Sequence, residues 1–257
     1  YKYINSHSPE VVIHSAARAH VINETTSDPL GGFRQVNTKS TLNIAKDSAK
    51  AGVKRFIFIS SITVNGESTA PDFVFKSNNI HDPHTPYALS KSEAEQGLIQ
   101  ISKDTGMEVV IIRAPLVHGS KAPANFGQLI RLAHKNIPLP LGAIHNKRSL
   151  VGVDNLVDLI VTCIDHPHAA NQTFLVSDDH DISTSELLKT MIVAAGYKPK
   201  LIPVPAGVLR FLAGLLGKSS VIDRMSSNLQ VDIGHTKDTL GWKPPISFEE
   251  GICRCFK

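Results

Sequence analysis

The residues best suited to chemistry are Tyr87 and Lys91, in the segment Tyr87-Ala88-Leu89-Ser90-Lys91. On a helix, side chains four residues apart lie on one face. A nearby ammonium favours the phenolate, so we expect the pKa of Tyr87 to lie below its ordinary value of about 10. The tyrosine can then exchange a proton with a substrate hydroxyl near neutral pH. Ser61, which ends an earlier apolar segment, is expected to face the same cleft.

Three short apolar segments are expected to be the buried strands that position these residues: 11–17, 55–61 and 109–115. A helix is predicted at 33–51, closed by Ala51-Gly52, and a second one runs from Pro86 past Gln100. Thr85 is the expected N-cap of that second helix, with Pro86 at its first position. This alternation predicts an α/β fold with a doubly wound parallel sheet of the Rossmann type.

The character of the sequence changes after Pro115. Helices are predicted near 125–135, 153–165, 184–195 and 205–216, with short strands near 173–177 and 200–204. We therefore expect residues 1–119 to form a cofactor domain and 149–170 to pack back on it. Residues 120–148 and 171–257 are expected to form a smaller mixed α/β lobe that binds the substrate.

The composition is that of an ordinary globular protein, with 42% hydrophobic and 19% charged residues among 257. The net charge of +4 is spread along the chain without a basic run, so nucleic acid is not an expected partner. Three cysteines suit a reducing compartment, and we expect no metal site, including at the His81-Asp82-His84 loop. No segment is long and apolar enough to span a membrane, and no signal-peptide pattern is present, so a cytoplasmic location is expected.

A dinucleotide-binding sheet normally opens with a strand and a Gly-x-Gly-x-x-Gly turn that holds the pyrophosphate. Nothing of this kind precedes Val11, and Gly31-Gly32 follows Asp28-Pro29, so that we predict a turn there. Two interpretations stay open. Either the sequence lacks the first βαβ units of such a sheet, or the protein has no such loop.

The segments together resemble the extended short-chain dehydrogenase/reductases. Within these proteins, they resemble the nucleotide-sugar epimerase/dehydratase group, of the UDP-glucose 4-epimerase type. They occur in the order of that family over almost the whole sequence. Roughly the first 60 residues of the family pattern, which hold the glycine-rich turn, are not in this sequence. The matching segments are 14–17, Asn37, 58–66, 87–91, 113–119 and Asp232 with 240–244.

The resemblance implies roles for individual residues. Tyr87 is the catalytic acid/base, Lys91 is its partner and holds the nicotinamide ribose, and Ser61 orients the sugar oxygen. The cofactor is NAD, with NADP left open, and its lining would include Ser15, Ala16, Ala17, Asn37, Ser60, Pro115 and Val117. Two tyrosines of the family pattern are replaced here, by Asn65 and His118. The family also implies a homodimer through helices 33–51 and 86–105.

For the sugar nucleotide, the resemblance points to Asn125, Arg148 and Arg224 as binding residues. A guanidinium fork suits bidentate phosphate binding, and Arg148 lies where the family places an arginine near the diphosphate. Arg224 would be a second phosphate ligand, although it stands two residues away from the family register.

The family dehydratases carry an acidic pair directly after the serine position, because loss of water needs an acid and a base. Ile62 and Thr63 stand there in this sequence, which disfavours a dehydratase. The leading hypothesis is an NAD-dependent 4-epimerase of a UDP-hexose or UDP-N-acetylhexosamine that acts through a transient 4-keto sugar. Two alternatives remain: an NAD(P)H-dependent 4-keto-6-deoxy nucleotide-sugar reductase of polysaccharide synthesis, and a non-catalytic sugar-nucleotide-binding protein on the same fold. The sequence leaves the nucleotide and the sugar open.

Overall fold

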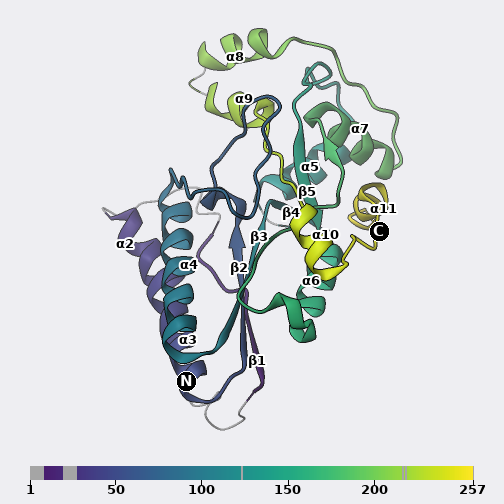
Figure 1. Ribbon diagram of the computed structural model, residues 1–257. Coiled ribbons are helices and arrows are strands. Elements are labelled where there is room, and N and C mark those ends of the chain that lie inside the picture. The colour runs from purple at the N-terminus through teal and green to yellow at the C-terminus, as the bar shows by residue number, and fades with distance from the viewer. Residues whose placement is uncertain (1–8, 20–27, 123, 216, 218, 257) are drawn as a thin grey trace.

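A four-stranded parallel sheet forms the centre of the computed structural model, which describes residues 9–19, 28–122, 124–215, 217 and 219–256 (Figure 1). The strand order is β1 (Val11–His14), β2 (Arg55–Ser61), β3 (Glu108–Ala114) and β6 (Thr173–Leu175). Helices cover both faces of the sheet. The predicted doubly wound α/β fold is therefore confirmed.

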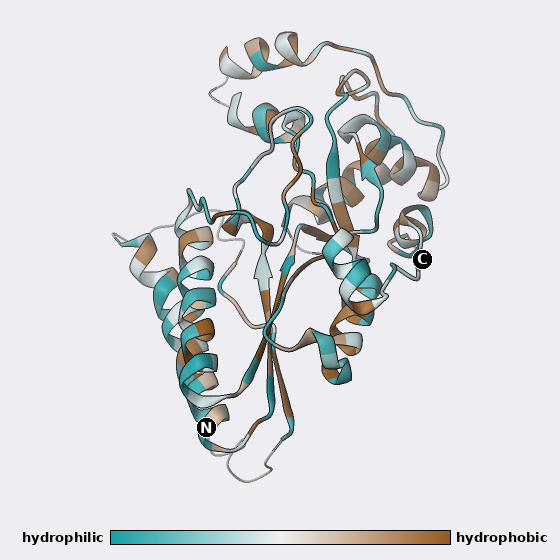
Figure 2. Cartoon of the chain, viewed as in Figure 1, coloured by the Kyte–Doolittle hydropathy of each residue, from teal (hydrophilic) through white to brown (hydrophobic). Residues whose placement is uncertain are grey.

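The two faces of the sheet are built from alternate residues of the same strands, because successive strand side chains point to opposite faces. On one face, Phe56 and Phe58 of β2 pack with α3 (Thr41–Lys50) and α4 (Pro86–Thr105). On the other face, Ile57 of β2 packs in a cluster with α6 (Val153–Asp165) and α10 (Gly234–Leu240). Figure 2 shows hydrophobic residues along the central strands.

The predicted helix at 33–51 is built in three pieces. They are α2 (Pro29–Phe33), a π-helical stretch η1 (Arg34–Ser40) and α3. The prediction of a turn at Gly31-Gly32 is wrong, because both glycines lie in α2. The carboxylate of Asp28 caps this helix and accepts a hydrogen bond from the amide of Gly31 at 2.8 Å. Gly52 follows α3 with a φ of +80°, a conformation that suits glycine.

A second, smaller mixed sheet consists of β4 (Leu116–His118), β5 (Arg148–Gly152) and β7 (Asp181–Ile182). Its core includes residues of α5 (Ala124–Lys135), α7 (Thr184–Ala194), α8 (Ala206–Leu215) and α11 (Phe248–Arg254). The strand predicted at 200–204 is absent. Leu201 forms only an isolated bridge with Leu139, and Pro203 and Pro205 cannot donate ladder hydrogen bonds.

The division into a cofactor domain and a sugar-nucleotide lobe stays a prediction. Three contacts bear on how its parts meet: β6 pairs with β3 in the main sheet, α6 packs on β2, and β5 pairs with β4. Three shorter helices complete the described elements: η2 (Ile62–Val64), η3 (Pro167–Ala169) and α9 (Ser219–Ser226). Across the described ranges, no helix has both the length and the apolar character needed to cross a membrane.

Candidate functional site

Ser61 and Tyr87 meet where the carboxyl end of β2 faces the first turn of α4. Thr85 caps α4 by accepting from the amide of Ala88, and Pro86 takes the first helical position, as predicted. Ser61 lies close enough to the phenol of Tyr87 for their interaction to lower the tyrosine pKa and so favour the phenolate. The same Ser61 oxygen accepts from the hydroxyl of Thr63 at 2.9 Å. The serine is thus held in one orientation beside the tyrosine.

Lys91 lies one turn further along α4 and is 1% exposed. Its ammonium donates to the carbonyl of Ile59 at 2.8 Å and lies 4.3 Å from the centre of the Phe58 ring. Burial lowers the pKa of Lys91 to about 8, and the carboxylate of Glu95 opposes that change. The lysine is therefore still largely protonated at neutral pH. An ammonium has three donors, and among the described residues Ile59 accepts from one of them.

The expectation of a lowered tyrosine pKa is wrong for this structure. Burial raises the pKa of Tyr87 above 10.0, and this effect is larger than the opposing hydrogen bond from Ser61. The physical reason is that Tyr87 loses water on packing against Phe33, at 6.1 Å between ring centres, while the ammonium of Lys91 is held by the backbone of β2. The phenol is consequently protonated at neutral pH.

The predicted cofactor residues lie at the carboxyl ends of β1, β2 and β3, where ligands bind in sheets of this kind. Ser15 and Ala16 are exposed after β1, and Ala17 is half-buried. Pro115 is buried and Val117 half-buried after β3. These side chains are small or apolar and carry no charge.

Asn37 and Ser60 are buried and use their side chains on the protein itself. The amide of Asn37 accepts from the backbone N–H of Arg18 at 2.7 Å and donates to the hydroxyl of Ser90 at 3.0 Å. It thereby ties the segment after β1 to α4, and it lies in the π-helical stretch, a geometry common at functional sites. The hydroxyl of Ser60 donates to Glu95.

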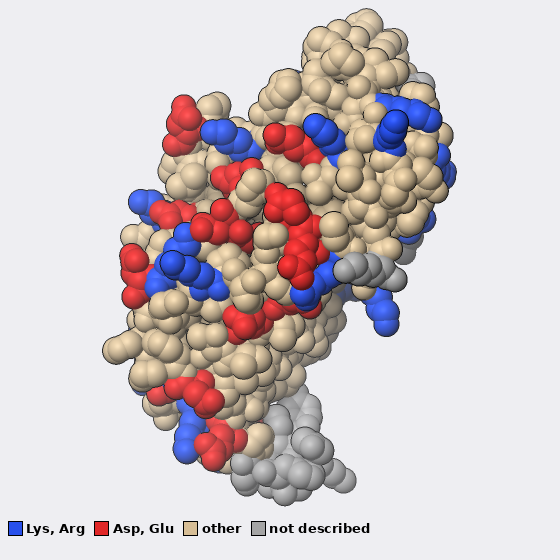
Figure 3. Space-filling model, turned by 90° about the vertical axis from the view of Figure 1, so that its right-hand side faces the viewer, with Lys and Arg blue, Asp and Glu red and all other residues tan. Residues whose placement is uncertain are grey.

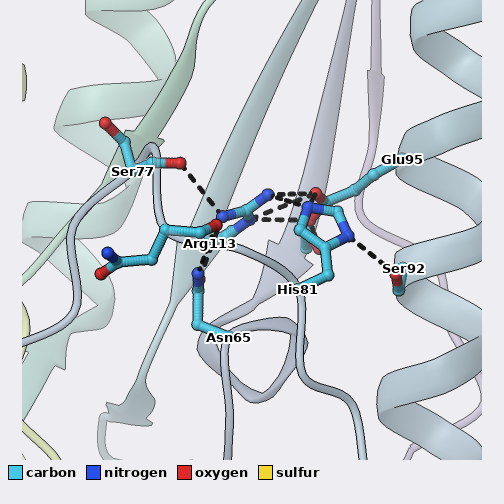
Figure 4. Close-up of polar contacts among 8 residues, drawn as sticks. Asn65, Ser77, His81, Ser92, Glu95 and Arg113 are labelled. Carbon is cyan, nitrogen blue, oxygen red and sulfur yellow. Dashed lines mark hydrogen bonds and ion pairs between the residues drawn. The ribbon is translucent and has the colours of Figure 1, made fainter.

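A buried polar network behind Lys91 was not predicted from the sequence (Figure 4). Glu95 is fully buried and pairs with Arg113 at 2.7 Å. Arg113 also donates to Asn65 at 3.0 Å and to the ring of His81. Glu95 stands four residues after Lys91, so the spacing of Tyr87 and Lys91 continues along the same helix face. That repeated spacing was the signal available in the sequence.

His81 is held neutral in this network. Burial lowers its pKa, and the charge of Arg113 lowers it further, against the opposing effect of Glu95. A guanidinium only donates, so Nε2 of His81 accepts and Nδ1 carries the proton toward the hydroxyl of Ser92, 2.8 Å away. In the described part of the chain, no cluster of His, Cys, Asp or Glu has the geometry of a metal site.

Two of the three predicted substrate residues come together in the lobe. The half-buried guanidinium of Arg148 donates to the backbone carbonyl of Arg224 at 2.8 Å, and burial lowers the pKa of Arg148. Arg224 is exposed at the end of α9. The side chain of Asn125 lies outside the described residues. A cavity of about 610 Å³ is lined by His145, Asn146 and Lys147 among others. These three residues directly precede Arg148 in the sequence.

The positions that depart from the family pattern have structural partners here. Asn65 accepts from Arg113, and His118 is paired with the buried carboxylate of Asp178 at 2.6 Å. Ile62 is 2% exposed and packs in the core, while Thr63 binds Ser61. No carboxylate therefore follows Ser61 at the positions where a dehydratase needs its acidic pair.

Comparison with known proteins agrees with this geometry. Residues 1–177 match the epimerase family, described as the NAD dependent epimerase/dehydratase family. The sequence is 54% identical over 243 residues to a UDP-glucose 4-epimerase of Vibrio cholerae, covering 94% of this chain and 74% of the relative. It is 27% identical over 241 residues to the N-acetyl-alpha-D-glucosaminyl-diphospho-ditrans,octacis-undecaprenol 4-epimerase of Escherichia coli, covering 88% and 71%.

Among solved structures, the fold is similar to that of the UDP-glucose 4-epimerase of Thermotoga maritima with UDP-glucose. The TM-score is 0.78 at 23% identity, and the match covers 99% of this chain and 78% of that one. With the Ser61–Tyr87–Lys91 arrangement in place at the carboxyl edge of the sheet, the chain belongs to the NAD dependent epimerase/dehydratase family.

Proposed function

We propose that this protein is an NAD-dependent nucleotide-sugar 4-epimerase that interconverts UDP-hexoses through a transient 4-keto sugar. The 54% identity to a UDP-glucose 4-epimerase over most of the chain supports the reaction and the UDP-hexose substrate. The observation that carries the proposal is the pairing of Ser61 with Tyr87 one helical turn from the buried ammonium of Lys91.

The residues at the sheet edge fit a nicotinamide dinucleotide. The ammonium of Lys91 has donors beyond its bond to Ile59, which suits a ribose hydroxyl, and the small residues Ser15 and Ala16 let a planar group approach the backbone. When bound, NAD supplies the hydride acceptor and donor for C4 of the sugar.

The chain's own residues handle the proton. Tyr87 is the proposed acid/base: its phenol is protonated in the free protein, and the interaction with Ser61 favours the phenolate form that the tyrosine must reach before it can accept the proton of the 4-hydroxyl. Returning the same proton from Tyr87 completes the epimerisation. Lys91, still protonated below its pKa of about 8, provides positive charge on the same helix face. Arg148 and Arg224 are proposed to hold the diphosphate and thereby fix the sugar at this site.

The test is to incubate the protein with UDP-glucose and NAD and to measure UDP-galactose by chromatography. Interconversion without net reduction of NAD is expected, and Tyr87→Phe should abolish it. Tyr197→Phe is the matched control, because Tyr197 is 41% exposed after the end of α7 and has no place in the site. Turnover that consumes stoichiometric NAD(P)H and a 4-keto sugar would instead identify a reductase.

A homodimer through α3 and α4 belongs to the same proposal. Val36 of η1 and Ile99 of α4 are 40% and 41% exposed, and these apolar side chains suit a helix-pair interface. Sedimentation of the wild-type protein and of Ile99→Glu would test it, because the charge should shift the protein to a monomer. A cytoplasmic location stays a prediction.

A further inference from the structure

Helix α8 turns an apolar stripe toward solvent. Val208, Phe211, Leu212 and Leu215 are 48%, 68%, 52% and 72% exposed. Their spacing of three and four residues places them on one helix face, the pattern that normally packs on a protein core. Within α8 only Leu209 is buried, and it alone joins the core of the lobe. This surface helix thus exposes the face that others bury.

The stripe belongs to a wider apolar surface at one end of the molecule, which we call the tip. The tip consists of α8 and segments 137–142 and 200–205, where Ile137 and Ile202 are 45% and 49% exposed. The two segments are joined by backbone hydrogen bonds, such as Ile202 to Leu139 at 2.8 Å. Figures 1 and 2 show α8 and the chain leading to it at the end opposite β1.

The charge around the tip is mostly positive, although Arg210 of α8 pairs with Asp223 of α9 at 3.1 Å. Between Leu187 and Ile222 the sequence has no Asp or Glu, and Lys189, Lys198 and Lys200 lie in this stretch. The stretch from Val109 to Val153, which includes α5 and the first tip segment, also lacks acidic residues. On the face that Figure 3 shows, the uppermost end of the molecule has no acidic side chain, and Lys, Arg and a few acidic side chains lie below it.

We propose that the tip docks the protein on the surface of an anionic phospholipid bilayer. An exposed apolar helix face beside cationic residues is the combination that binds bilayer interfaces. Phe211, Leu212 and Leu215 enter the headgroup region, and Lys198 and Lys200 face the lipid phosphates. At ten residues α8 is about 15 Å long, so it lies on the bilayer. A second copy of this chain fits the tip less well, because it would bring two cationic surfaces together.

The experiment is flotation of the protein with vesicles of phosphatidylcholine, with or without phosphatidylglycerol. We expect binding to the anionic vesicles and at least about tenfold weaker binding to the neutral ones. The variant Phe211→Ser/Leu215→Ser should also lose about tenfold, and Lys198→Gln/Lys200→Gln about fivefold for each charge. The matched control is Val157→Ser/Val161→Ser on α6, whose side chains are 51% and 57% exposed. It should bind like the wild type.

Three results would overturn the docking. They are no binding to anionic vesicles, an equal loss in the α6 control, and a Phe211→Ser/Leu215→Ser variant that changes the sedimenting mass without any vesicle binding. The last result would show that a second copy covers the tip. Circular dichroism of each variant checks that it is folded, which is expected because every substituted side chain is exposed. Epimerase activity plays no part in these measurements, so they stand or fall independently of the proposed reaction.

Discussion

Replacing Glu95 by Gln tests whether the network behind Lys91 holds the fold together. Glu95 is 0% and Arg113 3% exposed, and the carboxylate accepts two N–H groups of Arg113 besides the hydroxyl of Ser60. Glutamine keeps the size of the side chain but removes its charge. One of its two terminal atoms becomes a donor that faces a guanidinium, which is itself only a donor.

The expected loss of unfolding free energy is about 3 kcal/mol. Breaking one side of a buried ion pair costs about 3–5 kcal/mol, because the remaining charge is left uncompensated. The value should lie at the lower end, since Arg113 keeps Asn65, the carbonyl of Ser77 and His81 as acceptors. In a protein of this size, such a loss lowers the melting temperature by roughly 6–12 °C.

The assay is urea unfolding followed by circular dichroism, with Glu93→Gln as the matched control. Glu93 lies two residues away on α4 and also pairs with an arginine, Arg34, but these side chains are 26% and 43% exposed. An exposed pair contributes less than about 1 kcal/mol. If Glu95→Gln and Glu93→Gln lost the same free energy, the buried pair would have no special role and the reasoning would fail.

Three further predictions concern titration, burial and binding. Burial and the charge of Arg113 lower the pKa of His81 in the folded protein, so protonation of His81 favours the unfolded chain. The unfolding free energy should therefore fall as the pH drops below 6.5, by at most about 1.4 kcal/mol per pH unit. His81→Gln should reduce that slope in urea titrations at pH 7.5 and 5.5, and an unchanged slope would contradict the neutral histidine. Lys91→Met should stabilise the protein at pH 7 by about 1–2 kcal/mol while abolishing turnover. The pKa of Lys91, lowered from 10.5 to about 8, indicates that its buried charge is costly, and the loss of one hydrogen bond to Ile59 offsets part of the gain. A destabilised variant would contradict the costly buried charge. Arg148→Ala should raise the KM for the UDP-sugar about 10- to 100-fold with little change in kcat. Arg224→Ala should raise the KM less, because Arg224 is exposed. Equal effects of the two variants in steady-state kinetics would contradict the proposed diphosphate contacts.

Local signals in the sequence indicated the positions of the proposed catalytic residues. Thr85 and Pro86 start α4 one residue before Tyr87, and the apolar run that ends at Ser61 forms β2. Both signals depend on neighbouring residues only, so they hold before any tertiary contact forms. The same holds for the strand–helix rhythm from which the parallel sheet was predicted.

Other features depend on which segments pack together. Gly31 and Gly32 are helical because the side chain of Asp28 caps α2. Glu95 and Arg113 are far apart in the sequence and meet only because α4 lies on the sheet face beside β3. The outward stripe of α8 has the periodicity of a core-facing helix, and only its packing on the lobe decides which side meets water.

The sequence by itself determined the positions of the three proposed reactive residues, the helix that carries two of them, and the sheet at whose edge they lie. Tertiary structure alone decided the electrostatics of those groups: the phenol of Tyr87 is harder to ionise than its spacing from Lys91 predicted. The physical reason is that spacing along a helix sets which groups are neighbours, whereas a pKa depends on the water that packing removes from them.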